Sequence, residues 1–206
     1  MLHNWHYFID ILFPPTDDEL RLRHHTPDTI LDQYQPTVHN NVWALSSYHD
    51  PTVKAAITEC KYRNNYHATS LLSALLRQWL HTQPTIPTLL IPLPLSTQRL
   101  RKRGYNQVEQ VCLRVADLPH VTLLSKLLYR QRDTIPQTSL SRQDRLTNVK
   151  DAFAVHPTQL HDIQKYERII LCDDVVTTGA TFTAAASALT PHIVCAEQLV
   201  CVSLAH

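Results

Sequence analysis

Apolar residues along this chain form two kinds of pattern that alternate from one segment to the next. Spacings of three and four residues predict amphipathic helices over residues 51–62, 67–80 and 106–117. Short apolar runs predict strands at 89–91 and 169–172, and residues 121–129 are expected to form another strand. An alanine-rich stretch predicts a helix over 180–189, and two β-rich runs follow at 193–196 and 198–204. Because strands and helices alternate, we expect an α/β fold with a mainly parallel sheet and helices on both faces.

Polar residues support several of these boundaries. Asp50 followed by Pro51 is typical of an N-cap and the first helical position. Asn106 and Glu109 have the spacing of an N-cap and its reciprocal partner. Residues 96–104 lie between a predicted strand and a predicted helix, and we expect them to form a basic loop.

Two segments show no sustained period. Residues 1–45 are expected to form an irregular N-terminal appendage, and residues 46–206 a single domain. Residues 130–149 are polar and contain Pro136, which predicts a long loop that we call the hood. Loops of that length within a compact domain are usually functional.

The composition is that of a globular protein. The chain has 206 residues, of which 44% are hydrophobic and 18% are charged, so it can bury a sizeable core. No run of 18 apolar residues occurs, and we expect no membrane insertion. The first residues lack the basic region and the cleavage site of a signal peptide, so we expect a cytoplasmic protein.

Cysteine and histidine do not have the spacing of a metal site. The five cysteines, at positions 60, 112, 172, 195 and 201, are dispersed and odd in number, which is typical of core thiols. The thirteen histidines include adjacent pairs, but no acid or cysteine accompanies them at ligand spacing. We therefore expect no zinc.

Charge is unevenly distributed although the net charge is only +1. Residues 99–150 hold eleven Lys or Arg against four acids, whereas residues 1–60 hold three against eight. The basic segment is where a polyanion would bind. Nucleic acid, a highly phosphorylated small molecule or the acidic N-terminal segment itself could each fill that role.

Residues 169–181 carry the strongest chemical signal. An apolar run ends in Asp173 and Asp174, and the segment Thr-Thr-Gly-Ala-Thr at 177–181 then leads into a predicted helix. Backbone N–H groups at the start of a helix, together with threonine hydroxyls, can bind a phosphate. Gly179 tolerates a positive φ and lets a ligand approach the backbone closely.

The two acids need a different partner. Two carboxylates beside a phosphate repel it, so they would face sugar hydroxyls or a cation bridged by the ligand. A ligand with phosphate at one end and a ribose nearby would satisfy both sets of groups. The structural alternative is a solvated acidic turn followed by a threonine-capped helix.

All thirteen positions from Ile169 to Thr181 resemble the phosphoribosyl pyrophosphate (PRPP) signature of the type I phosphoribosyltransferases. The resemblance implies that Asp173 and Asp174 contact the ribose 2′- and 3′-hydroxyls as catalytic residues, while residues 177–181 wrap the 5′-phosphate. The implied PRPP-binding residues are Asp173, Asp174, Val175, Val176, Thr177, Thr178, Gly179, Ala180 and Thr181.

Three further stretches, at residues 59–62, 91–107 and 136–149, resemble the ComF family of competence protein F-like phosphoribosyltransferases in the same order. The segment Arg-Gly-Tyr-Asn-Gln at 103–107 is the most discriminating. The resemblance covers about residues 45–204 and implies a type I phosphoribosyltransferase fold, PRPP binding with Mg²⁺, and a link to DNA uptake in some bacteria. Family members commonly open with a four-cysteine zinc ribbon, whereas no cysteine here precedes Cys60, so residues 1–45 are a degenerate ribbon region on this comparison.

The same resemblance assigns roles to basic and amide side chains. Arg99 and Arg103 would hold pyrophosphate, and Mg²⁺ would bind through substrate oxygens without direct protein ligands. Candidates for closing over the ligand are Lys61, Asn106, Gln107, Arg142 and Arg145. Some have a structural alternative: Asn106 is equally suited to capping a helix, and Lys61 or Arg99 to lying on a solvated surface.

Two other functions stay open at this point. A non-catalytic factor could bind single-stranded DNA, or a protein of the competence machinery, through the basic segment 99–150. Only Tyr105 and Tyr129 lie among those basic residues, which argues mildly against base stacking. A scaffold acting through the acidic N-terminal segment is the third hypothesis. The sequence does not identify an acceptor substrate.

Overall fold

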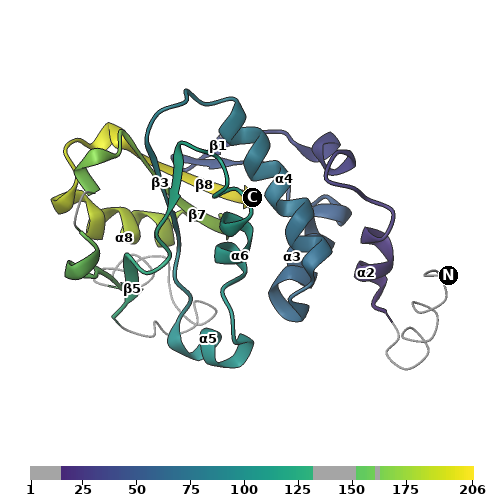
Figure 1. The fold of residues 1–206 in the computed structure, drawn as a ribbon. Helices are drawn as coiled ribbons and strands as arrows, with labels where there is room; N and C mark the ends of the chain where they lie inside the picture. The colour runs from purple at the N-terminus through teal and green to yellow at the C-terminus, as the bar shows by residue number, and fades with distance from the viewer. Residues whose placement is uncertain (1–14, 132–151, 161–162) are drawn as a thin grey trace.

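The computed structural model describes residues 15–131, 152–160 and 163–206. Its centre is a six-stranded sheet, and Figure 1 shows the fold. The strand order is β1-β2-β8-β7-β3-β4, and every neighbouring pair is parallel except β1 with β2. The strands are β1 (Thr37–His39), β2 (Val42–Ala44), β3 (Thr88–Pro92), β4 (Val121–Leu123), β7 (Arg168–Val175) and β8 (Leu199–Ala205). The expected α/β fold with a mainly parallel sheet is confirmed.

Helices cover both faces of this sheet, as expected. Figure 1 shows α3 (Pro51–Arg63), α4 (Tyr66–His81) and α6 (Gln107–Leu113) to one side and α8 (Ala180–Leu189) to the other. The side chain of Asp50 accepts hydrogen bonds from the N–H groups of Thr52 and Val53, so the predicted N-cap of α3 is confirmed.

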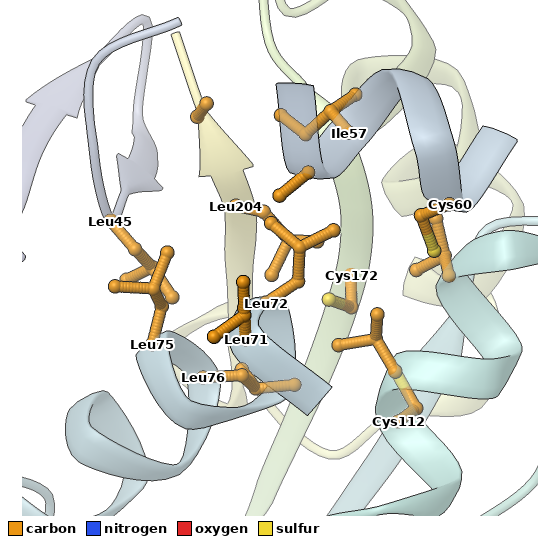
Figure 2. Packing of buried hydrophobic residues seen from close by; sticks show 14 of the residues in the cluster. Leu45, Ile57, Cys60, Leu71, Leu72, Leu75, Leu76, Cys112, Cys172 and Leu204 are labelled. Atoms are coloured by element: carbon orange, nitrogen blue, oxygen red, sulfur yellow. The ribbon is translucent and has the colours of Figure 1, made fainter. Parts of the chain in front are cut away.

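Successive side chains along the central strands point to opposite faces of the sheet, and each face forms its own hydrophobic core. Leu90, Ile170 and Cys172 face α3, α4 and α6, whereas their neighbours Ile169 and Leu171 face α8. Figure 2 shows the first of these cores, in which the leucines of α4 pack near Cys172 and Leu204. Because both faces are buried, residues 169–172 of β7 are all apolar, and Asp173 and Asp174 follow near its carboxyl end.

The basic segment expected as a loop is instead a helix, α5 (Thr97–Arg103). Ser96 caps it by accepting a hydrogen bond from the N–H of Arg99, and Gly104 ends it with φ +80°. None of its residues is buried, so it has no apolar stripe that periodicity could detect.

The single strand expected at 121–129 is wrong, because a turn divides it into β4 and β5 (Leu128–Arg130). β5 leaves the main sheet and pairs antiparallel with β6 (Phe153–Val155) across a long separation in sequence. The run at 193–196 is also not a strand, since a 3₁₀ turn over Ala196–Gln198 precedes β8. Most of the hood lies outside the described residues.

Residues 15–45 are more regular than expected. They contain α2 (Asp17–Leu22), a 3₁₀ turn (Thr29–Gln33) and a β1–β2 hairpin whose second strand pairs with β8. Asn40 and Asn41 form the two-residue turn with φ of 50° and 62°, the positive values that a tight hairpin requires. None of the helices in the described ranges has the length and apolar character needed to cross a membrane.

Candidate functional site

The two adjacent acids at the end of β7 lie on opposite faces of the sheet, because successive strand residues alternate. Asp174 points to the side of α3 and α6 and is only 8% exposed. Asp173 follows the register of Leu171 toward the α8 side and is partly buried, with one carboxylate oxygen accepting the N–H of Asp174 at 2.9 Å. The pair therefore presents two carboxylates with different surroundings.

Asp174 is held from two helices. The Nζ of Lys61, near the end of α3, lies 3.0 Å from Oδ1, and the Nε2 of Gln107, at the start of α6, donates to Oδ2 at 2.5 Å. Arg103 in turn donates to the Oε1 of Gln107 at 2.7 Å. These contacts fix the orientation of the carboxylate from both sides.

The segment 59–62 has a structural role for each residue. Glu59 is 2% exposed and accepts hydrogen bonds from Thr16 and Asn65, which ties the turn between α3 and α4 to α2. The carbonyl of Cys60 accepts the hydroxyl of Tyr105 at 2.9 Å, Lys61 reaches Asp174, and the ring of Tyr62 lies 5.2 Å from the guanidinium of Arg103.

The segment 103–107 meets the segment 59–62 at Asp174. Tyr105 bridges the Cys60 carbonyl and the N–H of Asn64, so it fastens the start of α6 to the end of α3. Asn106 caps α6 through the N–H of Val108 and also donates to the carbonyl of Leu93 at 3.0 Å. The helix-capping alternative for Asn106 is therefore correct, and its second bond orients the turn that follows β3.

Asp173 has an unusual electrostatic environment. Burial, followed by repulsion from Asp174, raises the pKa of the Asp173 carboxyl from 3.8 to about 7, although Lys61 and Arg130 act in the opposite direction. Arg130 lies on β5, where its Nε donates to the carbonyl of Pro94 at 2.9 Å and its guanidinium packs over Phe153. Sequence reasoning missed Arg130, because only the pairing of β5 with β6 brings it here.

The expected phosphate loop connects β7 to α8. Gly179 has φ +74° and precedes the first residue of α8, while Thr177 and Thr178 are exposed beside it. The N–H groups at the start of α8 carry the positive end of the helix dipole. The N–H of Ala180 contacts the Thr178 hydroxyl at 3.4 Å. A strand, an acidic pair, a polar loop and a helix thus follow one another as expected.

The remaining candidates are only partly brought together. Lys61 and Gln107 contact Asp174, and Arg103 contacts Gln107, whereas Arg99 lies exposed on α5. Arg142 and Arg145 lie outside the described residues. Within the part of the chain that is described, no three His, Cys, Asp or Glu side chains gather as a protein-bound metal would require.

A recess of about 560 Å³ lies elsewhere, lined by residues that include Ile163, Lys165 and His192. It adjoins the turns that precede β7 and follow α8, at the amino end of the strand. In parallel α/β sheets ligands bind beyond the carboxyl ends of the strands. The acidic pair, and not this recess, therefore occupies the position expected for the site.

Curated proteins similar in sequence to this chain are named for competence and for DNA utilization. It is 31% identical over 142 residues to competence protein F of Haemophilus influenzae, which is 66% of this chain and 61% of that protein. It is 31% identical over 157 residues to DNA utilization protein YhgH of Escherichia coli K12, covering 73% of this chain and 66% of the relative, and 28% identical over 165 residues to the Salmonella typhimurium protein of that name.

The matched segment thus spans slightly less than two thirds of the first two relatives. No family model matches the chain. The chain belongs to the ComF family.

Proposed function

We propose that the protein is a PRPP-binding phosphoribosyltransferase with the type I fold. The observation that carries the proposal is the meeting of three separate segments, 59–62, 103–107 and 173–181, around Asp174 at the carboxyl end of β7. Each contains residues of the family resemblance, and a ligand bound there would contact a phosphate loop and an acidic pair at once.

Each end of PRPP has a chemically suitable partner. The 5′-phosphate lies against the N–H groups and hydroxyls of residues 177–181, and the ribose hydroxyls face the acids. Lys61 and Gln107 each use one donor on Asp174, so its oxygens retain lone pairs for a hydroxyl and are oriented before the ligand arrives. Arg103 and Arg99 supply positive charge for pyrophosphate.

The reaction needs charge stabilisation at both ends of the breaking bond. An acceptor nucleophile forms a bond to ribose C1 and loses its proton, while the C1–oxygen bond breaks and its electron pair leaves with pyrophosphate. The anionic acids favour the positive charge that develops on the ring. Mg²⁺ bound through the oxygens of PRPP would neutralise charge on the leaving pyrophosphate, and the partly buried Asp173 carboxylate, when ionised, would attract that cation without ligating it.

Calorimetry with PRPP and Mg²⁺ tests this proposal directly. We expect the wild type to bind, and the double change Asp173→Asn/Asp174→Asn to weaken binding by about 10- to 100-fold, because hydrogen bonds to charged groups are lost. Asp117→Asn is the control, since Asp117 pairs with Arg77 on the surface at 2.6 Å. No heat from the wild type contradicts the proposal, and unchanged binding by the double variant contradicts the role of the acids.

A second candidate function is the binding of single-stranded DNA. It is favoured by a pair of exposed tyrosines that lie beside arginines, which the sequence pattern did not predict. Tyr62 and Tyr66 are 69% and 75% exposed at the junction of α3 and α4. The guanidinium of Arg103 lies 5.2 Å from the first ring and that of Arg114 lies 3.7 Å from the second. Exposed rings among arginines are the elements of a base-stacking surface, and α5 adds Arg101 and Lys102.

Fluorescence titration with a labelled oligonucleotide separates this candidate from a purely PRPP-binding role. Tyr62→Ala/Tyr66→Ala should weaken binding by about tenfold or more through lost stacking, whereas Tyr62→Phe/Tyr66→Phe should retain it. Arg101→Ala/Lys102→Ala should reduce the slope of log affinity against log salt concentration by the amount expected for about two lost phosphate contacts. An oligonucleotide affinity that changes neither with salt concentration nor with the tyrosine substitutions would exclude the second candidate.

A further inference from the structure

The turn of the β1–β2 hairpin touches the expected phosphate loop from a distant part of the sequence. The Nδ2 of Asn40 donates to the carbonyl of Thr177 at 3.2 Å. A Cβ added to Gly179 would lie 3.3 Å from the Cβ of Asn40 and 3.5 Å from its carbonyl oxygen, so the turn also lies directly against the glycine. Two points of the loop are thus in contact with one residue.

The hairpin that carries Asn40 is itself firmly attached. β2 pairs with β8, and the N–H of Leu45 extends this ladder to Ser203. The ring of His39, the residue before Asn40, packs against the ring of His206 with centroids 4.1 Å apart. Asn40 therefore projects from a strand pair joined to the central sheet, which makes it a fixed support for the loop.

The hydrogen bond to Thr177 has a geometric consequence for the next residue. The peptide between Thr177 and Thr178 is planar and trans, because the chain contains no cis peptide among the described residues. In a trans peptide the carbonyl and the following N–H point in opposite directions. When Asn40 holds the carbonyl of Thr177, the N–H of Thr178 must point away from Asn40.

We propose that Asn40 is a positioning residue that fixes the Thr177–Thr178 peptide so that the N–H of Thr178 is presented to the phosphate of the ligand. The inference rests on the proposed function, because the ligand is the 5′-phosphate of PRPP. A flipped peptide would present a carbonyl oxygen to the phosphate and remove a donor. Asn40 acts through the loop and does not touch the ligand.

Two isosteric variants test the inference. Asn40→Asp replaces the donor with an acceptor facing the Thr177 carbonyl. Asn41→Asp adds the same charge one residue away, and at both positions aspartate, like asparagine, tolerates the positive φ of the turn. We expect Asn40→Asp to weaken binding of PRPP with Mg²⁺ by about tenfold or more and Asn41→Asp by about twofold or less. Asn40→Gly, which removes the side chain without adding charge, should weaken it by about three- to tenfold.

Amide hydrogen exchange in the ligand-free proteins provides a readout independent of PRPP. Residues 177–181 should exchange faster in Asn40→Asp and Asn40→Gly than in the wild type or Asn41→Asp. The midpoints of urea unfolding of all four proteins should be equal, so that the difference in exchange reports on the loop and not on global stability. Equal exchange and equal affinity in all variants would overturn the inference, as would equal losses from the changes at positions 40 and 41. A wild type that binds no PRPP would overturn the proposed function and the ligand assigned here, whereas ordering of the loop by Asn40 is decided by exchange alone.

Discussion

Asp173→Asn is expected to raise the free energy of unfolding by about 2–4 kcal/mol at pH 8. The pKa of this carboxyl is raised from 3.8 to about 7 in the folded protein, chiefly by burial and then by repulsion from Asp174. A rise of that size destabilises the ionised folded state by up to about 4 kcal/mol, and partial exposure to water reduces the effect. Asparagine is neutral, has the same shape and can still accept the N–H of Asp174.

The pH dependence has a definite sign. Below pH 3.8 the carboxyl is protonated in both the folded and unfolded states, so it does not affect stability. Between the two pKa values the folded protein binds more protons than the unfolded chain, and stability falls as the pH rises. Above about pH 7 the full destabilisation is present. The advantage of Asp173→Asn should therefore grow from pH 4 to pH 7 and then level off.

The neighbouring change Asp174→Asn should lower the free energy of unfolding at pH 8, whereas Asp173→Asn should raise it. Lys61 and Gln107 contact different oxygens of Asp174, and asparagine replaces one of these oxygens with an NH₂ group, so one of the two donors loses its acceptor. The change also removes the charge that neutralises Lys61. We expect a loss of about 1–2 kcal/mol at pH 8, reduced by relief of the repulsion on Asp173. Urea unfolding of both variants at pH 5 and pH 8 measures the contrast. Destabilisation by Asp173→Asn at pH 8 would contradict this account of the pair.

Leu72→Ala is expected to lower the free energy of unfolding by about 2–5 kcal/mol. Leu72 is 1% exposed and belongs to the core between α4 and the sheet, in the group drawn with Cys172 and Leu204 in Figure 2. Truncation removes buried methyl groups and leaves a cavity that the surrounding helices fill only in part. The midpoint of urea unfolding should fall, with little change in slope.

Leu113→Ala provides the matched control for this prediction. Leu113 ends α6 and is 51% exposed, so its replacement should change stability by no more than about 0.5 kcal/mol. Similar losses from both leucines would show that the core does not depend on the packing of α4. Since Cys172 directly precedes the acidic pair, loosening this core should also disturb the end of β7.

Sequence patterns predicted the elements that have their own local signals. α4 carries a wide apolar stripe, α3 begins at Asp50-Pro51, and residues 169–172 of β7 form an apolar run buried on both faces. α5 has no such stripe, because none of its residues is buried, and its local signals are a serine cap and a glycine end. The β1–β2 hairpin has strands of three residues, too short to show alternation, and its Asn-Asn turn is a weaker signal than Asn-Gly.

The sequence predicted which segments form the candidate site but not which of their side chains contact one another. The acidic pair and Gly179 fall at the strand end and the helix start, as the motif implied. That Lys61 and Gln107 would both reach Asp174 depends on how α3 and α6 pack against β7. Arg130 and Asn40 depend on strand pairings between distant segments, which carry no signal in a single sequence.

The position of β8 constrains how the chain can fold during synthesis. This strand lies between β2 and β7, so Ala44 finds its partner only when Ser203 has been made. Until then the ribosome-bound chain carries two strands with unpaired backbone edges facing a gap in the sheet, a state prone to aggregation. Closing such a long-range pairing is slow. The loop support from Asn40 can form only at this last step, so the ligand site should be completed late, after the hydrophobic cores have begun to assemble.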